Sequence, residues 1–374
     1  MKRELERIEI PGAREAEERA WGVVERAALE LLPVDARRTR LLRPLFVVVA
    51  IAVLAGAVAS PPGRAVIDRV RRVVGVELAA PALFRLPAAG RLLVASDSGI
   101  WVVQADGSRR LLGAYREASW SPFGRFVVAA RRNELATLEP DGTARWSLAR
   151  PDVRFPRWAG GATDTRIAYF DRVGLHVVAG DGTGDRLIAP AEAGPAAWRP
   201  GPRRELAYIS ASEIRVQDAD TGRVVWRANR GRAEDISALS WSTDGRRLLV
   251  LAPHELRVYD ALGRVAAQDH PSAGTTNAAA EFVPGTHQVA VTRVHGAQSD
   301  VFLLRGKRLL FRGTGVFYGL AASPDGRWLL VAWPTADQWV FIRADGRKIV
   351  AVSNISAQFR SRTFPRVEGW CCGT

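Results

Sequence analysis

The sequence is poor in cysteine, methionine and lysine. Its 374 residues include two cysteines, one methionine and three lysines, at Lys2, Lys307 and Lys348. The cysteines, Cys371 and Cys372, are adjacent, so they form neither a disulfide framework nor a set of zinc ligands. Because a bridge between neighbouring cysteines is strained, we interpret them as two unpaired thiols at the tail of the chain.

The common catalytic and metal-binding motifs are also missing from the sequence. There is no H-E-x-x-H, no G-x-S-x-G and no phosphate-binding loop. The five histidines have no ligand spacing; they are His176, His254, His270, His287 and His295. His287 and His295 could meet across one predicted hairpin, but we interpret each histidine as a surface or structural residue. We predict no catalytic residue, no metal site and no cofactor.

One glycine-rich stretch deserves a separate test. The sequence GDGTGD, at residues 180–185, has two aspartates of the kind that a calcium loop uses. It lacks the lysine and the strand-to-helix setting of a phosphate loop. It also falls where a repeating β-turn is expected, so we interpret it as a turn.

The chain carries a large excess of positive charge. Its formal charge is +14 at pH 7, and 53 − 3 = 50 of its basic residues are arginine. Residues 1–44 contain ten basic and nine acidic side chains, so the excess lies beyond them. The electrostatic field of this excess charge attracts anionic lipids, polysaccharides or nucleic acid.

The N-terminal part of the sequence predicts helices and one membrane anchor. Residues 13–32 place apolar side chains along one helical stripe, which predicts an amphipathic helix in a cytoplasmic tail, 1–40. Residues 45–60 have no charge, and a helix of that length spans ~24 Å of a ~30 Å hydrocarbon core. We predict a transmembrane helix over 41–60, with a buried core helix as the alternative.

This apolar helix is interpreted as a retained signal anchor. The sequence AVAS, at residues 57–60, resembles a signal-peptidase site, but 44 residues precede the apolar run, more than a signal peptide has. Arginines flank the apolar helix on both sides, so the distribution of positive charge does not set its orientation. Because a large C-terminal domain can be translocated regardless of charge, we predict that the N-terminus lies in the cytoplasm. Residues 61–80 are predicted as a juxtamembrane linker with a basic amphipathic helix over 63–75, which either lies on the membrane or packs on the domain below as a stalk.

From residue 81 to the C-terminus the sequence repeats. An anchor residue precedes a turn and an apolar strand in each copy, at Leu86, Trp120, Trp158, Trp198, Trp241, Phe282 and Ala322. Counted from Arg85, the steps are 35, 38, 40, 43, 41 and 40 residues. Each copy then has a second strand and a glycine turn, at Asp106–Gly107, Asp141–Gly142, Asp181–Gly182, Thr221–Gly222, Leu262–Gly263, Arg305–Gly306 and Asp345–Gly346.

Seven copies with a period near 40 predict an all-β fold, a seven-bladed β-propeller over 81–374. In Ser323–Pro324–Asp325–Gly326 the side chains suit a type I turn, and glycine accepts the left-handed position. Six or eight blades are the alternatives, because Arg85–Gly113 is the weakest copy and could complete the last blade. The C-terminal FPRVEGWCC could instead pair with the first blade and close the ring.

The repeats resemble a known group. WSPFGR, WSTDGR and SPDGR, each followed by an apolar strand and a glycine turn, are similar to the WD40-like β-propeller repeats of the TolB type. The resemblance covers roughly residues 85–370. The copies at Trp158, Trp198 and Phe282 lack the Asp–Gly core, and no G-H…W-D set is present. The resemblance implies a platform for binding proteins or ligands.

We therefore expect a monomeric, non-enzymatic scaffold or sensor in a bacterial cell envelope, with the propeller outside the cytoplasm. Its face or channel would bind a protein or an anionic envelope polymer. Nucleic acid is not expected, because core packing explains the tryptophans and no RNA-binding signature is present. Two alternatives stay open: a regulator whose tail binds a sigma factor, and a propeller enzyme that acts on envelope polysaccharide with carboxylates in the channel.

Overall fold

The computed structural model describes residues 79–80, 85–159, 161, 165–192, 194–230 and 236–372. The cytoplasmic tail, the transmembrane helix and the basic juxtamembrane helix that the sequence predicts lie outside these residues. In the described part of the chain, no helix is both long enough and apolar enough to cross a membrane.

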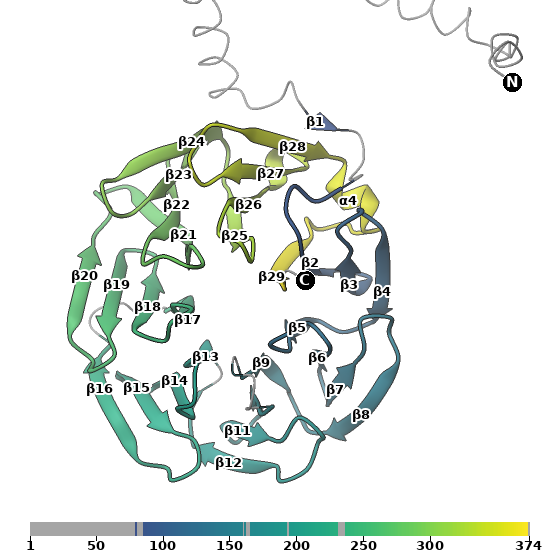
Figure 1. Ribbon diagram of the computed structural model, residues 1–374, viewed down its shortest axis with the longest axis vertical. Coiled ribbons are helices and arrows are strands. Elements are labelled where there is room, and N and C mark those ends of the chain that lie inside the picture. Colours follow the sequence, from purple (N-terminus) through teal and green to yellow (C-terminus); the bar gives the residue numbers. More distant parts are fainter. Residues whose placement is uncertain are drawn as a thin grey trace, which may run out of the picture. The chain divides into compact units, whose positions relative to one another are not determined.

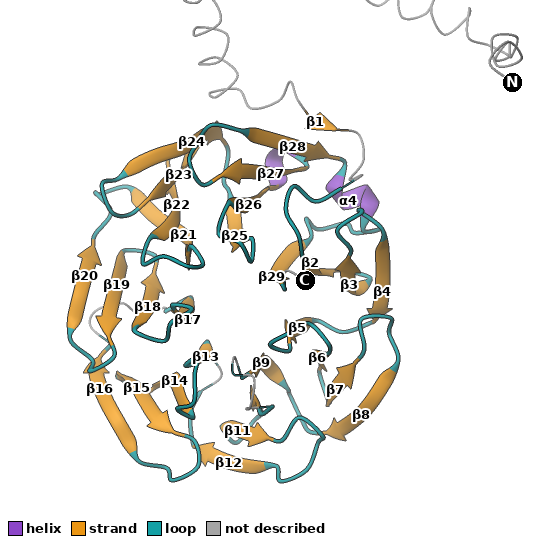
Figure 2. Cartoon of the chain, in the orientation of Figure 1, coloured by secondary structure: helices purple, strands orange, loops and turns teal. Residues whose placement is uncertain are grey.

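Seven sheets are arranged in a ring around a common centre (Figure 1). Strands and turns make up almost all of the described residues, apart from the 3-10 turn η2 (Pro334–Ala336) and the short helix α4 (Ile355–Gln358) (Figure 2). Each sheet is a blade with four antiparallel strands, numbered here from the inside outward. The predicted all-β fold with seven blades is confirmed.

The innermost strands of blades 1 to 7 are β29 (Arg366–Cys371), β5 (Glu117–Trp120), β9 (Arg154–Trp158), β13 (Ala196–Trp198), β17 (Ala238–Trp241), β21 (Thr275–Phe282) and β25 (Tyr318–Ala322). The second strands are β2 (Arg91–Ser96), β6 (Val127–Arg131), β10 (Ile167–Phe170), β14 (Glu205–Ser210), β18 (Arg247–Ala252), β22 (Val289–His295) and β26 (Trp328–Trp333). The third strands are β3 (Gly99–Val103), β7 (Glu134–Leu138), β11 (Leu175–Val178), β15 (Glu213–Asp218), β19 (Glu255–Asp260), β23 (Gln298–Leu303) and β27 (Gln338–Arg343). The outermost strands are β4 (Arg109–Gly113), β8 (Ala144–Ala149), β12 (Arg186–Ala189), β16 (Val224–Asn229), β20 (Val265–Asp269), β24 (Arg308–Thr314) and β28 (Ile349–Ser353).

The repeat anchors fall at one structural position, the last residue of the innermost strand. Trp120 pairs with Val127 of the second strand, and Trp241 pairs with Leu248 in the same way. The prediction that Leu86 is the first anchor is wrong. Leu86 precedes β2, and Trp370 of β29 occupies the anchor position, where it pairs with Leu92. The reason is that blade 1 takes its innermost strand from the other end of the chain.

Ring closure therefore joins the two ends of the propeller. Strand β29 runs antiparallel to β2, and together with β3 and β4 they form blade 1. The predicted pairing of FPRVEGWCC with the first blade is confirmed. The alternative in which Arg85–Gly113 completes the last blade is wrong, because these residues form a separate sheet. Outside blade 7, the two-residue strand β1 (Ala79–Ala80) adds a parallel edge to β28.

Burial falls from the inside of each blade to the outside. All six residues of β26 are buried, whereas in β20 only Asp269 is buried and the other four are exposed. A strand that neighbouring blades cover on both faces can be apolar throughout, as the run of apolar residues in WLLVAW predicts. The outermost strand faces solvent and needs few apolar side chains.

The inner turns combine local hydrogen bonds with contact to the next blade. In blade 7 the Ser323 hydroxyl donates to Asp325 Oδ1 over 2.6 Å and accepts the Trp328 N–H over 2.9 Å. Gly326 has a φ of +67°, and a Cβ there would lie 2.4 Å from the carbonyl oxygen of Pro284 in blade 6. The glycine is therefore required both by the left-handed turn and by the close approach of two blades.

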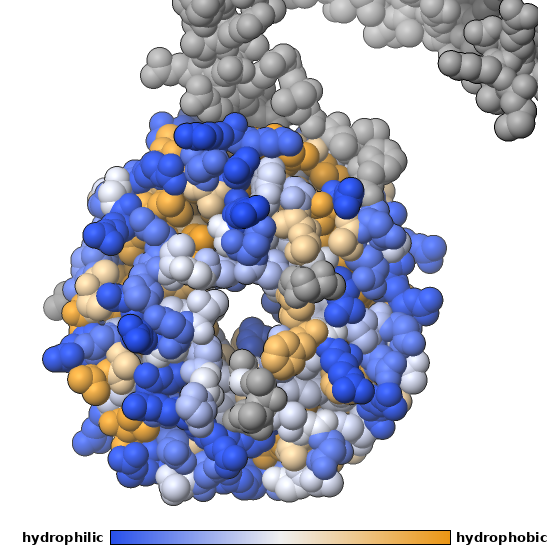
Figure 3. Space-filling model, in the orientation of Figure 1, coloured by the Kyte–Doolittle hydropathy of each residue, from blue (hydrophilic) through white to orange (hydrophobic). Residues whose placement is uncertain are grey.

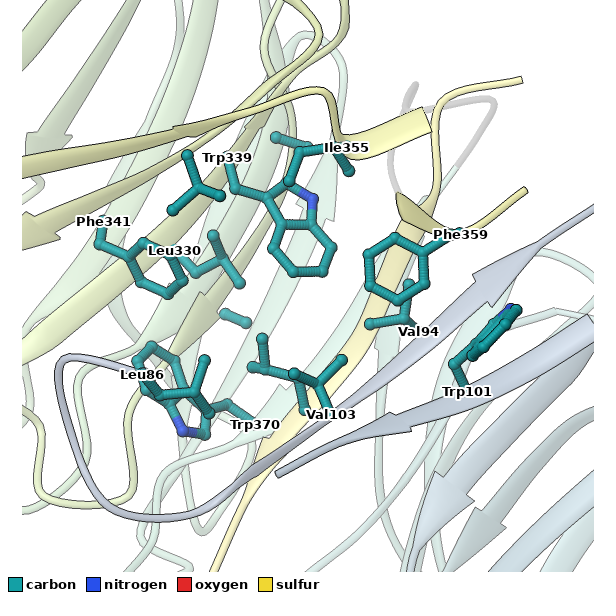
Figure 4. Packing of buried hydrophobic residues seen from close by; sticks show 14 of the residues in the cluster. Leu86, Val94, Trp101, Val103, Leu330, Trp339, Phe341, Ile355, Phe359 and Trp370 are labelled. Atoms are coloured by element: carbon teal, nitrogen blue, oxygen red, sulfur yellow. The ribbon is translucent and has the colours of Figure 1, made fainter. Parts of the chain in front are cut away.

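Aromatic side chains fill the gap between blades 7 and 1, where the ring closes (Figure 4). The ring of Trp370 meets Phe341 edge-on at 5.7 Å between centroids. Phe359, which follows α4, lies 5.1 Å from Trp339 and 5.8 Å from Trp101. This packing makes the C-terminal strand part of the core that it closes.

Ending the chain at Pro365 removes β29, and we expect the propeller to lose cooperative unfolding. Strand β2 would lose its partner and keep an unpaired edge. The cavity left by Trp370 alone would cost about 3–5 kcal/mol, a large share of the free energy of unfolding of about 5–15 kcal/mol that is usual for a protein. Thermal unfolding followed by circular dichroism measures the loss. A chain ended at Cys372 is the control and should unfold at the wild-type temperature. An unchanged midpoint after removal of β29 would show that the ring does not depend on this closure.

Candidate functional site: the turn face and the central channel

The inner and outer glycine turns lie on the same face of the ring. In an antiparallel sheet the turn between strands one and two and the turn between strands three and four occupy the same end. All seven predicted outer turns connect the third and fourth strands, from Asp106–Gly107 to Asp345–Gly346. We call this side the turn face. Figure 3 shows one face of the ring, where hydrophilic residues predominate around an open centre.

Basic residues follow the turn glycines directly in eight places. These residues are Arg91, Arg125, Arg223, Arg246, Arg264, Lys307, Arg327 and Arg347. All of them except Arg91 are exposed. Several approach turn aspartates, such as Arg264 to Asp260 at 2.8 Å and Arg246 to Asp244 at 3.8 Å. The turn face thus carries exposed cations interspersed with the aspartates of the turns, and ion pairs join some of them.

The turn aspartates are occupied by the turns themselves. In blade 3, Asp181 Oδ1 accepts hydrogen bonds from the Thr183 hydroxyl at 2.7 Å and the Thr183 N–H at 3.0 Å, which lower the pKa of Asp181. Asp185 accepts instead from Tyr169 and Arg150. The interpretation of GDGTGD as a blade turn is confirmed. Across the described residues, no group of three or more His, Cys, Asp or Glu side chains is placed to bind a metal.

Three glutamates on innermost strands lie beside the channel. Glu117 accepts a hydrogen bond from the Phe155 N–H, and Glu281 accepts one from the Ala322 N–H over 3.2 Å. Each of these bonds connects one blade to the next. Glu368 instead forms an ion pair with Arg366 over 2.6 Å. Nothing in the sequence distinguishes these residues, because a glutamate before an anchor has no distinctive pattern.

Burial changes the acidity of two of these glutamates. Burial raises the pKa of Glu281 to about 8, although the hydrogen bond from Ala322 opposes this change. Burial also raises the pKa of Glu368, with Arg366 and Arg157 acting against it and Glu117 adding to it. Glu117 and Glu368 are therefore close enough to interact, and each of the three glutamates has a partner within the ring.

The histidines lie in separate surroundings. His176 Nε2 is 3.2 Å from Asp171, and His287 Nε2 is 2.8 Å from Asp244. His287 lies in the turn before β22 and His295 ends that strand, so roughly 20 Å or more of extended chain separates them. The idea that these two meet across a hairpin is wrong, because they occupy opposite ends of one strand.

The two cysteines take the place of the missing inner turn in blade 1. The Sγ atoms of Cys371 and Cys372 lie next to each other. The interpretation of both residues as unpaired thiols stays a prediction. Ring closure brings both residues against blade 2: Cys371 Sγ lies 3.8 Å from the Ser121 carbonyl oxygen and Cys372 Sγ lies 3.5 Å from that of Pro122. Cys372 has a left-handed φ of +65°.

Solved structures with a similar fold are propellers. The β-propeller domain of Cps50 (Swd1) from Myceliophteria thermophila matches with a TM-score of 0.54 and 13% identity, over 65% of this chain and 89% of that one. The C-terminal WD40 domain of Sif2 matches with a TM-score of 0.51 and 14% identity, over 76% of this chain and 83% of that one. The fold is a WD40-type β-propeller. At these identities the likeness establishes the fold alone.

No protein-family model matches the sequence, and no curated protein does. The WD40-type ring nevertheless offers what protein binding needs, which is a rigid scaffold with broad faces and a central channel. Its seven blades present the exposed turn residues in a fixed circular order. A partner that contacts several blades would therefore meet charges at set positions.

We expect Glu281→Gln to remove part of the pH dependence of stability. The pKa of Glu281 is about 8 in the folded chain and about 4.5 in the unfolded one, so the folded state holds its proton between these values. Stability is therefore lost as pH rises from about 4.5 to 8, by at most ~1.4 kcal/mol per pH unit. Glutamine keeps an oxygen that accepts the Ala322 N–H and has no proton to lose.

Thermal unfolding of both chains between pH 5 and 8.5 measures this effect. The midpoint of the variant should exceed that of the wild type by an amount that grows as pH rises. Glu192→Gln, at an exposed position, is the control and should leave the profile unchanged. A constant difference between variant and wild type at every pH would contradict the raised pKa.

Proposed function

We propose that this protein is a membrane-tethered, extracytoplasmic β-propeller that binds partners without turning them over. It would act as a scaffold or sensor in a bacterial cell envelope. The observation that carries the proposal is the closed seven-bladed ring whose turn face is lined by exposed cations. Such a face suits an acidic partner, either a protein or an anionic envelope polymer.

The tether and the family assignment rest on the sequence. Residues 45–60 form the only long uncharged run that precedes the propeller, and they suit a signal anchor. The repeats are similar to those of TolB-type propellers, which supports a place in the bacterial envelope. A large domain after a signal anchor can translocate regardless of its charge, which supports an outside location.

The contacts in the channel favour binding over catalysis. A propeller enzyme needs carboxylates that are free to meet substrate. Here Glu117 and Glu281 accept backbone hydrogen bonds from the next blade, and Glu368 is paired with Arg366. Two of the three therefore take part in holding blades together. The glutamates beside the channel therefore have a structural role, and the turn face would bind the partner.

Reporter fusions test the topology. A reporter that is active only outside the cytoplasm should work when it is fused after residue 374 and should fail when it is fused after residue 40. These results would place the N-terminal tail in the cytoplasm and the propeller outside it. An inactive C-terminal fusion with an intact chain would place the propeller in the cytoplasm and overturn the envelope function.

Two variants matched in charge test the turn face as the binding surface. Replacing Arg223, Arg264 and Arg347 by serine should weaken binding of poly-L-glutamate, the acidic polypeptide probe, by ~10-fold, because the attraction depends on local charge. Replacing Arg116, Arg132 and Arg360, which are exposed on the opposite face, should weaken binding by less than about 2-fold. Equal losses for the two variants in a titration would mean that net charge alone, and not this face, attracts the probe.

A further inference from the structure

The gap between blades 2 and 3 contains a pocket of about 610 Å³. Its walls come from the inner turn and strands of blade 2 and from the anchor and outer turn of blade 3. The volume lies within the usual range of sites for small molecules, ~300–1,000 Å³. Thr137 departs from the repeat in this gap, and Phe126 and Arg125 add an aromatic wall and an exposed cation.

The departure from the repeat is a buried hydroxyl without a partner. Thr137 lines the pocket, its side chain is 2% exposed, and its Oγ1 has no hydrogen-bond partner. It pairs with Val128, and the corresponding third-strand residues in the other blades are Val102, Val177, Val216, Val258, Leu303 and Phe341. All six are apolar and buried. A buried hydroxyl without a hydrogen bond lowers the stability of the fold. A ligand that forms a hydrogen bond with it would explain why threonine, and not an apolar residue, occupies this position.

A second feature of this gap is its aromatic wall. Arg91 lies over Trp120 at 5.0 Å in the previous gap, and Arg166 lies over Trp198 at 5.3 Å in the next one. Between blades 2 and 3 the same position holds Phe126, which stacks on Trp158 with ring centroids 6.1 Å apart and planes 12° apart. This gap therefore has a flat apolar wall where its two neighbouring gaps have an arginine.

Trp146 forms the opposite wall and is held in place. Its indole N–H donates to the Gly180 carbonyl over 2.7 Å. A Cβ on Gly182 would lie 2.9 Å from the same ring, so the outer turn of blade 3 rests directly on it. The indole face is therefore fixed before any ligand enters, which lowers the entropy that binding would cost.

A third feature is a cation at the mouth that has no carboxylate partner. Arg125 is exposed, lies 5.4 Å over the Phe126 ring, and has no carboxylate within ion-pair distance among the described residues. The other lining charges are engaged: Arg145 pairs with Glu139, and Asp181 accepts from Thr183. The free guanidinium thus gives the pocket a positive entrance above an apolar interior.

We propose that this pocket binds a flat aromatic carboxylate that carries a hydrogen-bonding group at its far end. The ring would lie against Phe126, Trp158 and Trp146. The carboxylate would meet Arg125 at the mouth, and the far group would exchange a hydrogen bond with Thr137 at the base. This site is independent of the turn-face proposal, because it needs neither an acidic macromolecule nor a membrane.

Calorimetric titration of the full chain with 6-hydroxy-2-naphthoate and with 2-naphthoate tests the site. Both probes are flat aromatic carboxylates, and only the first has a hydroxyl at its far end. We expect both to bind, with the hydroxylated probe tighter by roughly 3- to 10-fold because it satisfies Thr137. No heat of binding with either probe up to millimolar concentration would overturn the proposal.

Two variants separate the roles of the polar groups. Thr137→Val should remove the advantage of the hydroxylated probe, leave 2-naphthoate binding unchanged and raise the unfolding temperature, because valine matches the other blades. A structural role alone would raise that temperature without changing the ratio of the two affinities. Arg125→Gln should weaken the binding of both probes by ~10-fold, because it removes a charged hydrogen-bond donor.

The repeat supplies a matched control for the arginine. Arg327 occupies the same place after the inner-turn glycine of blade 7, is also exposed, and does not line the pocket. Arg327→Gln should leave both affinities within 2-fold of the wild type. If it weakens the probes as much as Arg125→Gln does, or if Thr137→Val leaves the preference intact, the probes bind elsewhere and the proposal is wrong.

Discussion

Closure of the ring is the constraint on which the rest of the structure depends. The inner strands of each blade are apolar on both faces, so a blade is stable only between two neighbours. Seven blades satisfy this need when the first and last meet, and the chain achieves this by lending its C-terminal strand β29 to blade 1. Hydrogen bonds from Thr363 and Arg362 to Asp97 add to this closure and lower the pKa of Asp97 to about 2.

The same constraint determines how the polar residues of the channel are used. The indole N–H of Trp198 donates to the Arg157 carbonyl of the preceding blade, and that of Trp241 donates to Ala197. Glu117 and Glu281 accept backbone N–H groups of the following blade. Contacts between blades therefore occupy polar groups on several of the innermost strands. The turns, which contact neighbouring blades mainly through glycine, leave their charged side chains exposed for recognition.

Departures from the repeat are the most informative positions in such a ring, because the repeat itself states what packing requires. Six blades place an apolar side chain where blade 2 has Thr137, so packing does not explain the hydroxyl. Phe126 and Arg125 line the same pocket and add an aromatic wall and an exposed cation. A departure from the repeat inside a pocket points to a ligand, whereas the regular positions explain the fold.

The sequence by itself determined the all-β class, the seven-fold repeat, the positions of six anchors and all seven outer turns. These features are local, because turn chemistry and strand burial are written within each stretch of about 40 residues. Only the tertiary structure decided that Trp370 is the seventh anchor, that Cys371 and Cys372 meet blade 2, and that Thr137, Phe126 and Trp158 line one pocket. Each of these contacts joins residues from different blades or opposite chain ends, and no local pattern encodes which faces a closing ring brings together.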